Sequence, residues 1–321
     1  MGWVRAWKPL APTERYSEPV NNDHDKRRGQ IVRIGAGRAG AEKGKLGAMT
    51  DVEILRYAAF STDPAGGNPA GVVLDASALT DAEMLGIAAD LGYSETAFLT
   101  GDRLRFFSPL AEVPFCGHAT VATSVALGDR QGPGTYTFVT NAGEIPVTVD
   151  ERGRATLTSV PAAVGEIGDV DLVALLAALR WDADDLDPVL RPRIAYAGAY
   201  HPVIAVKSRH RLADLDYDVP ALKALMESRG WTTVQLVWRE GPLSFHVRNP
   251  FPVGGIYEDP ATGAAAAAFG GYLRGLGLVP DDAVVELSQG TDMGRPGRLT
   301  VTLTPGEAGV RVSGNAVPVT G

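Results

Sequence analysis

The chain lacks several features that particular classes of protein need. It has one cysteine in 321 residues, Cys116, so an intrachain disulfide is impossible and a reducing compartment such as the cytoplasm is expected. No run of eighteen apolar residues occurs, so no membrane-spanning helix is expected. The formal net charge is −8, whereas nucleic-acid binders usually carry a basic surface. We therefore expect neither nucleic acid nor a membrane as a partner.

Metal and nucleotide signatures are also weak. The five histidines show neither an H-x-x-x-H spacing nor a paired Cys/His spacing, so no metal site is predicted. Gly35, Gly37 and Gly40 have the G-x-G-x-x-G spacing of a dinucleotide-binding fingerprint. The stretch after them, AEKGKLGAMT, lacks the apolar helix that such a fingerprint must open. We interpret these glycines as part of a flexible segment, and a dehydrogenase remains an alternative that an NAD(P) titration tests.

The first 48 residues differ from the rest of the chain. They contain ten lysines and arginines against five acidic residues. The stretch NNDHDKRRGQ is highly polar without a helical or strand period, and the segment has no apolar core of a secretory signal. We expect residues 1–48 to be a mostly disordered tail and Met49 to be the functional start. Ordered packing of this segment onto the core would contradict that view.

The remainder has the composition and patterning of a folded α+β protein. The hydrophobic content of the whole chain is 45%, which is enough to bury a core. An apolar run at 52–60 predicts the first strand. Thr80, with Glu83 three residues later, predicts the capped start of a helix that ends near Gly92. Strand pairs separated by turns follow, and AVVELSQG and RLTVTLTPG predict strands near the end.

Two small-residue helices occupy equivalent places in the two halves of this pattern. CGHATVATSVAL at 116–127 and PATGAAAAAFGGYL at 260–273 each follow strands and a glycine-containing entry. Small side chains suit a helix that strands surround closely. We therefore predict an α+β fold of two similar domains, 49–180 and 181–321. Each is expected to be a β-barrel-like sheet wrapped around a central helix, with the last strand able to return to the first domain.

The starts of these two helices, at 117–120 and 262–265, carry the main functional signal. A helix N-terminus exposes unpaired N–H groups and a partial positive charge, and glycine there allows a ligand close approach. Two such ends facing one cleft would hold a carboxylate. His118 lies beside the first end, and Glu258 and Asp259 lie beside the second. One acid before a helix is commonly a cap, but polar groups at both equivalent ends favour a site.

Glu95 and Cys116 are two further candidates. Glu95 in GYSETAFL enters an apolar strand, where glutamate is uncommon. A carboxyl in apolar surroundings suits proton transfer near neutral pH, and the alternative is a strand residue that faces solvent. Racemases that use two thiols are excluded because the chain has a single cysteine. We interpret Cys116 as a small buried apolar residue.

From about Met49 onward, the sequence resembles the phenazine-biosynthesis PhzF-like family, within the diaminopimelate-epimerase-like fold. The stretches that carry the resemblance stand in the order and at the spacing found in that family. They are FSTDPAGGNPAGVVLD, GYSETAFL, FFSPLAEVPFCGHAT, EDPATGAAAAA and QGTDMGRPGRL. The first 48 residues have no counterpart in the family.

The resemblance implies a homodimer without a cofactor or a metal, and an active site between the two domains. A well-known activity in the family is isomerisation of trans-2,3-dihydro-3-hydroxyanthranilate, so a small carboxylate is the implied substrate. The implied acid/base is Glu95, and His118 and Asp259 are implied to orient the substrate and assist proton movement. Gly117 and Gly263 would offer backbone N–H groups. Asn68 is implied to line the pocket.

One position departs from the family pattern. Ala264 stands where the family usually has a serine whose hydroxyl helps to bind the substrate carboxylate. Its backbone N–H remains, but a hydrogen bond to a charged group, worth about 1.5–3 kcal/mol, is absent. This leaves the substrate open among small cyclic amino or hydroxy acids. A single-base epimerase and a non-catalytic small-acid binding protein remain alternatives.

Overall fold

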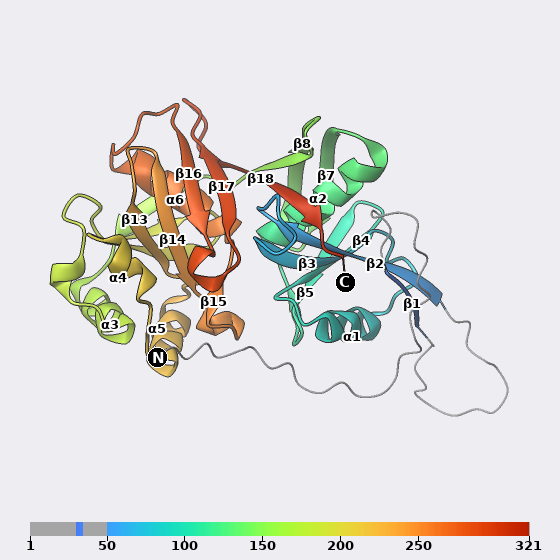
Figure 1. Ribbon diagram of the computed structural model, residues 1–321, viewed down its shortest axis with the longest axis horizontal. Helices are drawn as coiled ribbons and strands as arrows, with labels where there is room; N and C mark the ends of the chain where they lie inside the picture. The colour runs from blue at the N-terminus through green and yellow to red at the C-terminus, as the bar shows by residue number, and fades with distance from the viewer. Residues whose placement is uncertain (1–29, 35–49, 321) are drawn as a thin grey trace.

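The structure is a computed structural model that describes residues 30–34 and 50–320. It has two lobes side by side, one at each end of the long axis (Figure 1). Residues 30–34 form strand β1 (Gln30–Ile34), which pairs antiparallel with β2 (Thr50–Ala59). The prediction of a disordered tail is therefore wrong for these residues, because their backbone completes a sheet edge. The remaining tail residues, including Gly35, Gly37, Gly40 and Met49, lie outside the described part.

The first lobe is a closed barrel of eight strands around one helix. Every strand pairs with the next, and the last strand of the chain closes the ring between β9 and β2. The strands are β2, β3 (Asn68–Val73), β4 (Thr96–Thr100), β5 (Arg103–Phe107), β7 (Gly134–Thr140), β8 (Gly143–Val149), β9 (Arg154–Thr158) and β18 (Arg311–Pro318). The enclosed helix is α2 (Gly117–Gln131), and its residues from His118 to Leu127 are buried.

The second lobe repeats this arrangement around helix α6 (Gly263–Gly275). Its strands are β10 (Ala163–Glu166), β11 (Arg193–Tyr196), β12 (Tyr200–Val206), β13 (Gln235–Arg239), β14 (Ser244–Pro250), β16 (Val284–Gln289), β17 (Gly297–Thr302) and the shared β18. Adjacent strands pair in this order from β10 to β18. Just before the two outermost strands, β10 and β18, begin, the Ala162 N–H donates to the Ala308 carbonyl at 3.0 Å.

The small residues of α6 have a direct steric reason. A Cβ added at Gly270 would lie 2.6 Å from a methyl carbon of Val301, and one at Gly271 would lie 2.5 Å from the Cβ of Ala162. Larger side chains would push the surrounding strands apart, because a packed interior leaves no slack. The two-barrel fold and the enclosed helices predicted from the sequence are therefore confirmed.

The remaining helices cover the outer faces. Helix α1 (Asp81–Leu91) begins with the predicted capping box of Thr80 and Glu83 and ends at Gly92 in the left-handed conformation. The helices α3 (Asp169–Leu179), α4 (Arg209–Ala213) and α5 (Val219–Arg229) belong to the second lobe (Figure 1). Within the described residues, none of the helices combines the length and apolar character needed to cross a membrane.

The two barrels share one topology. In the first, β3 and β4 are parallel, as are β5 and β7; in the second, the parallel pairs are β12 with β13 and β14 with β16. A two-residue strand precedes each central helix, β6 (Glu112–Val113) before α2 and β15 (Glu258–Asp259) before α6.

Because β10 pairs with β11, the second barrel begins between β9 and β10. The predicted boundary at 180/181 is therefore too late, since it placed β10 and α3 in the wrong domain.

Candidate active site between the barrels

The first element of the site is the meeting of two helix N-termini. A Cβ added at Gly117, the first residue of α2, would lie 3.8 Å from the Cα of Gly263, the first residue of α6. The same position would lie 3.9 Å from the backbone nitrogen of Ala264. The two positive helix ends therefore face each other across a short gap that only glycine leaves open. This is the convergence of helix ends that the sequence predicted.

On the first-barrel side, four polar side chains form a connected cluster. Glu95 lies just before β4, and Cys116 and His118 lie at the start of α2. The Cys116 thiol donates to Oε2 of Glu95 at 3.5 Å, and its sulfur lies 3.2 Å from Nδ1 of His118. The Nε2 atom of His118 is 3.6 Å from Oε2 of Glu95 and 3.4 Å from the hydroxyl oxygen of Ser94.

The protonation of this cluster follows from its burial. Burial, with the Glu95 charge adding to it, raises the pKa of the Cys116 thiol, and burial lowers the pKa of His118 although Glu95 opposes this. With a neutral thiol and a neutral imidazole, Ser94 donates to Nε2, Nδ1–H donates to sulfur and the thiol donates to Glu95, whereas Nε2 and Oε2 of Glu95, 3.6 Å apart, share no hydrogen bond. The chain of donors ends on the Glu95 carboxylate.

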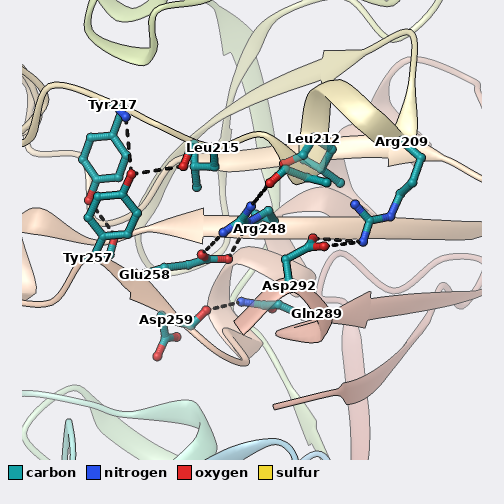
Figure 2. Close-up of polar contacts among 11 residues, drawn as sticks. Arg209, Leu212, Leu215, Tyr217, Arg248, Tyr257, Glu258, Asp259, Gln289 and Asp292 are labelled. Carbon is teal, nitrogen blue, oxygen red and sulfur yellow. Dashed lines mark hydrogen bonds and ion pairs between the residues drawn. The ribbon is translucent and has the colours of Figure 1, made fainter. Parts of the chain in front are cut away.

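On the second-barrel side, Asp259 is held by three neighbours. Asn68 donates from Nδ2 to Oδ1 of Asp259 at 2.7 Å, and Thr262 donates from its hydroxyl to Oδ2 at 2.6 Å. Gln289 fixes the turn around it, because its side chain accepts from the Thr262 N–H at 3.0 Å. The Gln289 side chain also donates to the Asp259 carbonyl at 2.8 Å, the contact that Figure 2 draws. Asn68 comes from the first barrel, so its contact with Asp259 joins the two halves at the site.

Asp259 has an unusual proton affinity for an aspartate. Burial raises the pKa of Asp259 to about 7; the nearby Glu95 charge adds to this, while the hydrogen bonds from Thr262 and Asn68 oppose it. Because the Glu95 charge affects the pKa of Asp259, the carboxyl groups of these two residues interact electrostatically. A carboxyl with a pKa near 7 can hold or release a proton at neutral pH, which suits acid/base work.

This pKa predicts a pH-dependent stability. In the unfolded chain Asp259 loses its proton near pH 3.8, whereas in the fold it keeps it up to about pH 7. The protonated group therefore stabilises the fold fully below pH 3.8, and this contribution is lost as the pH rises to about 7. The Asp259→Asn side chain cannot ionise, so this variant does not lose stability as the pH rises. Above pH 7 its free energy of unfolding should be higher than that of the native protein, by up to roughly 4 kcal/mol.

Urea unfolding between pH 3.5 and 8.5 measures this difference. The two proteins should converge at the acidic end, and Asp90→Asn, at an exposed position on α1, serves as the control that leaves the profile unchanged. Parallel profiles for the native protein and Asp259→Asn would contradict the expectation.

Behind Asp259 lies a buried ion pair. Glu258 and Asp259 are adjacent on β15, and Figure 2 shows Asp259 pointing away from the side on which Glu258 meets Arg248. The Nε–H of Arg248 donates to Oε1 of Glu258 at 2.9 Å and a second N–H contacts Oε2. The same guanidinium donates to the carbonyls of Leu212 and Ala213, so it anchors β15 to the end of α4.

The first barrel has an equivalent ion pair. Glu112 lies at the same place on β6 as Glu258 on β15, and Arg105 binds it through two contacts of 2.8 Å. From these glutamates onward, the two equivalent segments of the chain align without a gap, EVPFCGHA at 112–119 with EDPATGAA at 258–265. Asp259 then stands where the first barrel has Val113, and His118 stands where the second has Ala264. Each half therefore contributes a different group to one shared site.

The structure brings the predicted site residues together. Glu95, His118, Asp259, Asn68, Gly117, Gly263 and Ala264 all lie around the meeting point of the two helices. Cys116 is buried in the hydrophobic core of the first barrel, as expected, and its thiol also contacts Glu95 and His118, which the sequence did not predict. The sequence analysis also missed Ser94, Thr262 and Gln289. Their presence in the motifs SET, DPATG and QGTD was the available signal.

The fold and this site define a class of protein, one with two barrels whose central helices meet beside a buried cluster of carboxyl, imidazole and thiol groups. The family model for the phenazine biosynthesis-like proteins matches residues 57–321, and the chain belongs to this family. It is therefore an isomerase, as are the curated relatives by name.

Three comparisons give the degree of similarity. The uncharacterized isomerase YddE of Escherichia coli K12 is 33% identical over 285 residues, covering 83% of this chain and 95% of the relative. The trans-2,3-dihydro-3-hydroxyanthranilate isomerase of Pseudomonas chlororaphis is 29% identical over 276 residues, covering 81% and 94%. The crystal structure of a PhzF-family phenazine biosynthesis protein from Bacillus anthracis superimposes with a TM-score of 0.74 at 27% identity, covering 83% and 96%.

Proposed function

We propose that the protein is a cofactor-independent isomerase that moves a proton within a small cyclic amino or hydroxy acid. The observation that carries the proposal is the position of the Glu95 carboxyl, 13% exposed and 3.6 Å from His118, beside the two facing helix N-termini. Such a reaction shifts a proton and a double bond without net oxidation, so its balance requires neither a nucleotide nor a metal.

In the proposed mechanism, the substrate carboxylate lies between the N-termini of α2 and α6. Their unpaired N–H groups and dipoles stabilise its negative charge. Ala264 provides only its backbone N–H there, so the substrate gains no hydroxyl contact at this position. The amine or hydroxyl group of the substrate binds His118 and Asp259, which come from opposite barrels. The reacting sp³ ring carbon then lies beside Glu95.

Glu95 performs the proton transfer itself. Its carboxylate removes a proton from the sp³ carbon, and the electron pair of the broken C–H bond enters the adjoining π-system. The same carboxyl returns a proton at another carbon of that system, so atoms and charge balance. The donor chain that runs from Ser94 through His118 and Cys116 orients Glu95 for both steps.

Proton exchange with solvent tests this proposal. The protein is incubated in D₂O with trans-2,3-dihydro-3-hydroxyanthranilate and with a panel of cyclic amino and hydroxy acids, and the products are followed by NMR. We expect deuterium at a ring carbon together with a shifted double bond, without added NAD(P) or metal. Exchange with loss of optical activity but no shift of the double bond would favour the single-base epimerase. Tight binding without exchange would favour a binding protein.

The carboxylate position gives a separate prediction. Gly117→Ala should fold normally, because its Cβ would meet no atom closer than 3.8 Å. The added methyl would nevertheless fill the gap between the helix ends, so we expect carboxylate affinity to fall at least about tenfold, or 1.4 kcal/mol. Calorimetric titration with anthranilate measures the change, and Gly165→Ala, which has open space around it, is the control. Unchanged affinity would place the carboxylate elsewhere.

The family resemblance also implies a homodimer and a small carboxylate as the partner, and the single cysteine favours a cytoplasmic location. These remain part of the proposal. Light scattering of the purified chain measures the oligomeric state directly.

A further inference from the structure

We propose that the Glu95, Cys116 and His118 side chains form a binding site for a single zinc ion, and that zinc bound there blocks the isomerase. The site lies wholly on the first barrel, at the turn before β4 and the start of α2. Among the described residues, these three offer one ligand atom each, all within 4.8 Å of one another.

The spacing of the three atoms matches a zinc coordination shell. Oε2 of Glu95 lies 3.5 Å from the Cys116 sulfur, the sulfur lies 3.9 Å from Nε2 of His118, and Nε2 lies 3.6 Å from Oε2. A tetrahedral zinc ion with bonds of about 2.0–2.3 Å holds its ligand atoms roughly 3.3–3.6 Å apart. One ion can contact all three atoms once the His118 ring turns to aim Nε2 at it, because the sulfur now lies closer to Nδ1, at 3.2 Å, than to Nε2.

The ligand types favour zinc over harder cations. Thiolate, imidazole and carboxylate are the donors that zinc takes in proteins, whereas magnesium and calcium prefer oxygen alone. Zinc would displace the Cys116 proton, so the S–H bond breaks, a Zn–S bond forms and the proton passes to solvent. Three protein ligands leave the fourth position of the ion for water or a substrate oxygen.

Zinc at this place has a functional consequence. Cys116 and His118 are 7% and 5% exposed, and Glu95 is 13% exposed, so an ion there would be largely enclosed. The same Oε2 atom cannot both coordinate zinc and accept a proton from a substrate carbon. The binding follows from the geometry alone, whereas the inhibition rests on the proposed role of Glu95.

The single cysteine makes the binding step directly observable. Cobalt(II) bound to a thiolate gives a charge-transfer absorption in the near ultraviolet, and Cys116 is the only source of thiolate in the chain. We expect this absorption to saturate at one cobalt per chain, to be displaced by zinc, and to be absent from both Cys116→Ala and Cys116→Ser. Zinc affinity measured by calorimetry should fall at least roughly 100-fold in these variants.

A matched control is His246→Gln, because His246 lies 3.5 Å from Glu240 in another histidine–carboxylate pair that has no thiol. Its cobalt spectrum and zinc affinity should equal those of the native protein. Absence of the charge-transfer band, or zinc affinity that survives both Cys116 variants, would overturn the binding site.

The inhibition is measured separately as the ratio of proton-exchange activity with and without one equivalent of zinc. We expect at least a tenfold reduction that EDTA reverses. Zinc binding at Cys116 that leaves the exchange rate unchanged would overturn the inhibitory role. Failure of the proposed isomerase activity would instead appear as no exchange in zinc-free protein, with the cobalt spectrum intact.

Discussion

Glu95→Gln should reduce isomerisation of a competent substrate by about 10²–10⁴-fold while leaving the fold intact. Glutamine has the shape of glutamate and can still accept from the Cys116 thiol, but it cannot take a proton from carbon. The effect should appear in kcat, with little change in KM, because substrate positioning by the helix ends and Asp259 remains. Single-turnover and steady-state kinetics in D₂O separate these two contributions.

The control for this variant is Glu151→Gln, which removes a carboxylate from an exposed turn of the first barrel and should not alter the rate. Circular dichroism and the melting temperature of Glu95→Gln should match those of the native protein. Turnover by Glu95→Gln at a rate close to native would remove Glu95 from the mechanism and with it the proposed proton transfer.

The largest stability effect is expected at the buried ion pair behind Asp259. Arg248→Met removes the partner of Glu258, whose side chain is 3% exposed. Burial already raises the pKa of Glu258 even with Arg248 beside it, so an unpaired carboxyl there is costly. We expect a loss of about 3–5 kcal/mol in free energy of unfolding. Urea denaturation followed by circular dichroism measures it.

The internal duplication provides a matched control for this prediction. Arg105→Met breaks the equivalent pair with Glu112, but those side chains are 19% and 28% exposed, so water can replace the lost contacts. We expect a loss of only about 1 kcal/mol there. The double variant Arg248→Met/Glu258→Leu should recover part of the loss, since no buried charge is left unpaired. Equal losses at the two pairs would show that burial is not the deciding factor.

Local sequence was sufficient to predict several elements of the fold. The capping box of Thr80 and Glu83 and the glycine after α1 depend on residues within a few positions of each other. Both were predicted from the sequence, and the structure has both. The alanine run of α6 predicted a helix with no radial room, which the close contacts of Gly270 and Gly271 confirm. Strand β1, QIVRI, was missed although three of its five residues are β-branched, because polar and basic residues flank it and its partner β2 lies beyond a glycine-rich stretch.

The predicted domain boundary at 180/181 was wrong for a related reason. β10 is four residues long and gains its identity from its pairing with β11, which lies beyond helix α3. The order of predicted elements along the chain does not show which strands pair, because the closure of the barrel decides the strand partners.

The sequence by itself determined the two enclosed helices, their glycine starts and the chemical groups beside them, because helix periodicity, side-chain size and residue type are properties of neighbours along the chain. Only the tertiary structure decided that Cys116 contacts Glu95 and His118, and that Asn68 of one barrel holds Asp259 of the other. Cys116 and His118 are neighbours on α2, but Glu95 lies 21 residues before Cys116 and Asn68 lies 191 residues before Asp259, so these contacts depend on how two closed sheets pack around facing helix ends. That packing also raises the pKa of Asp259, since burial is a property of the whole fold.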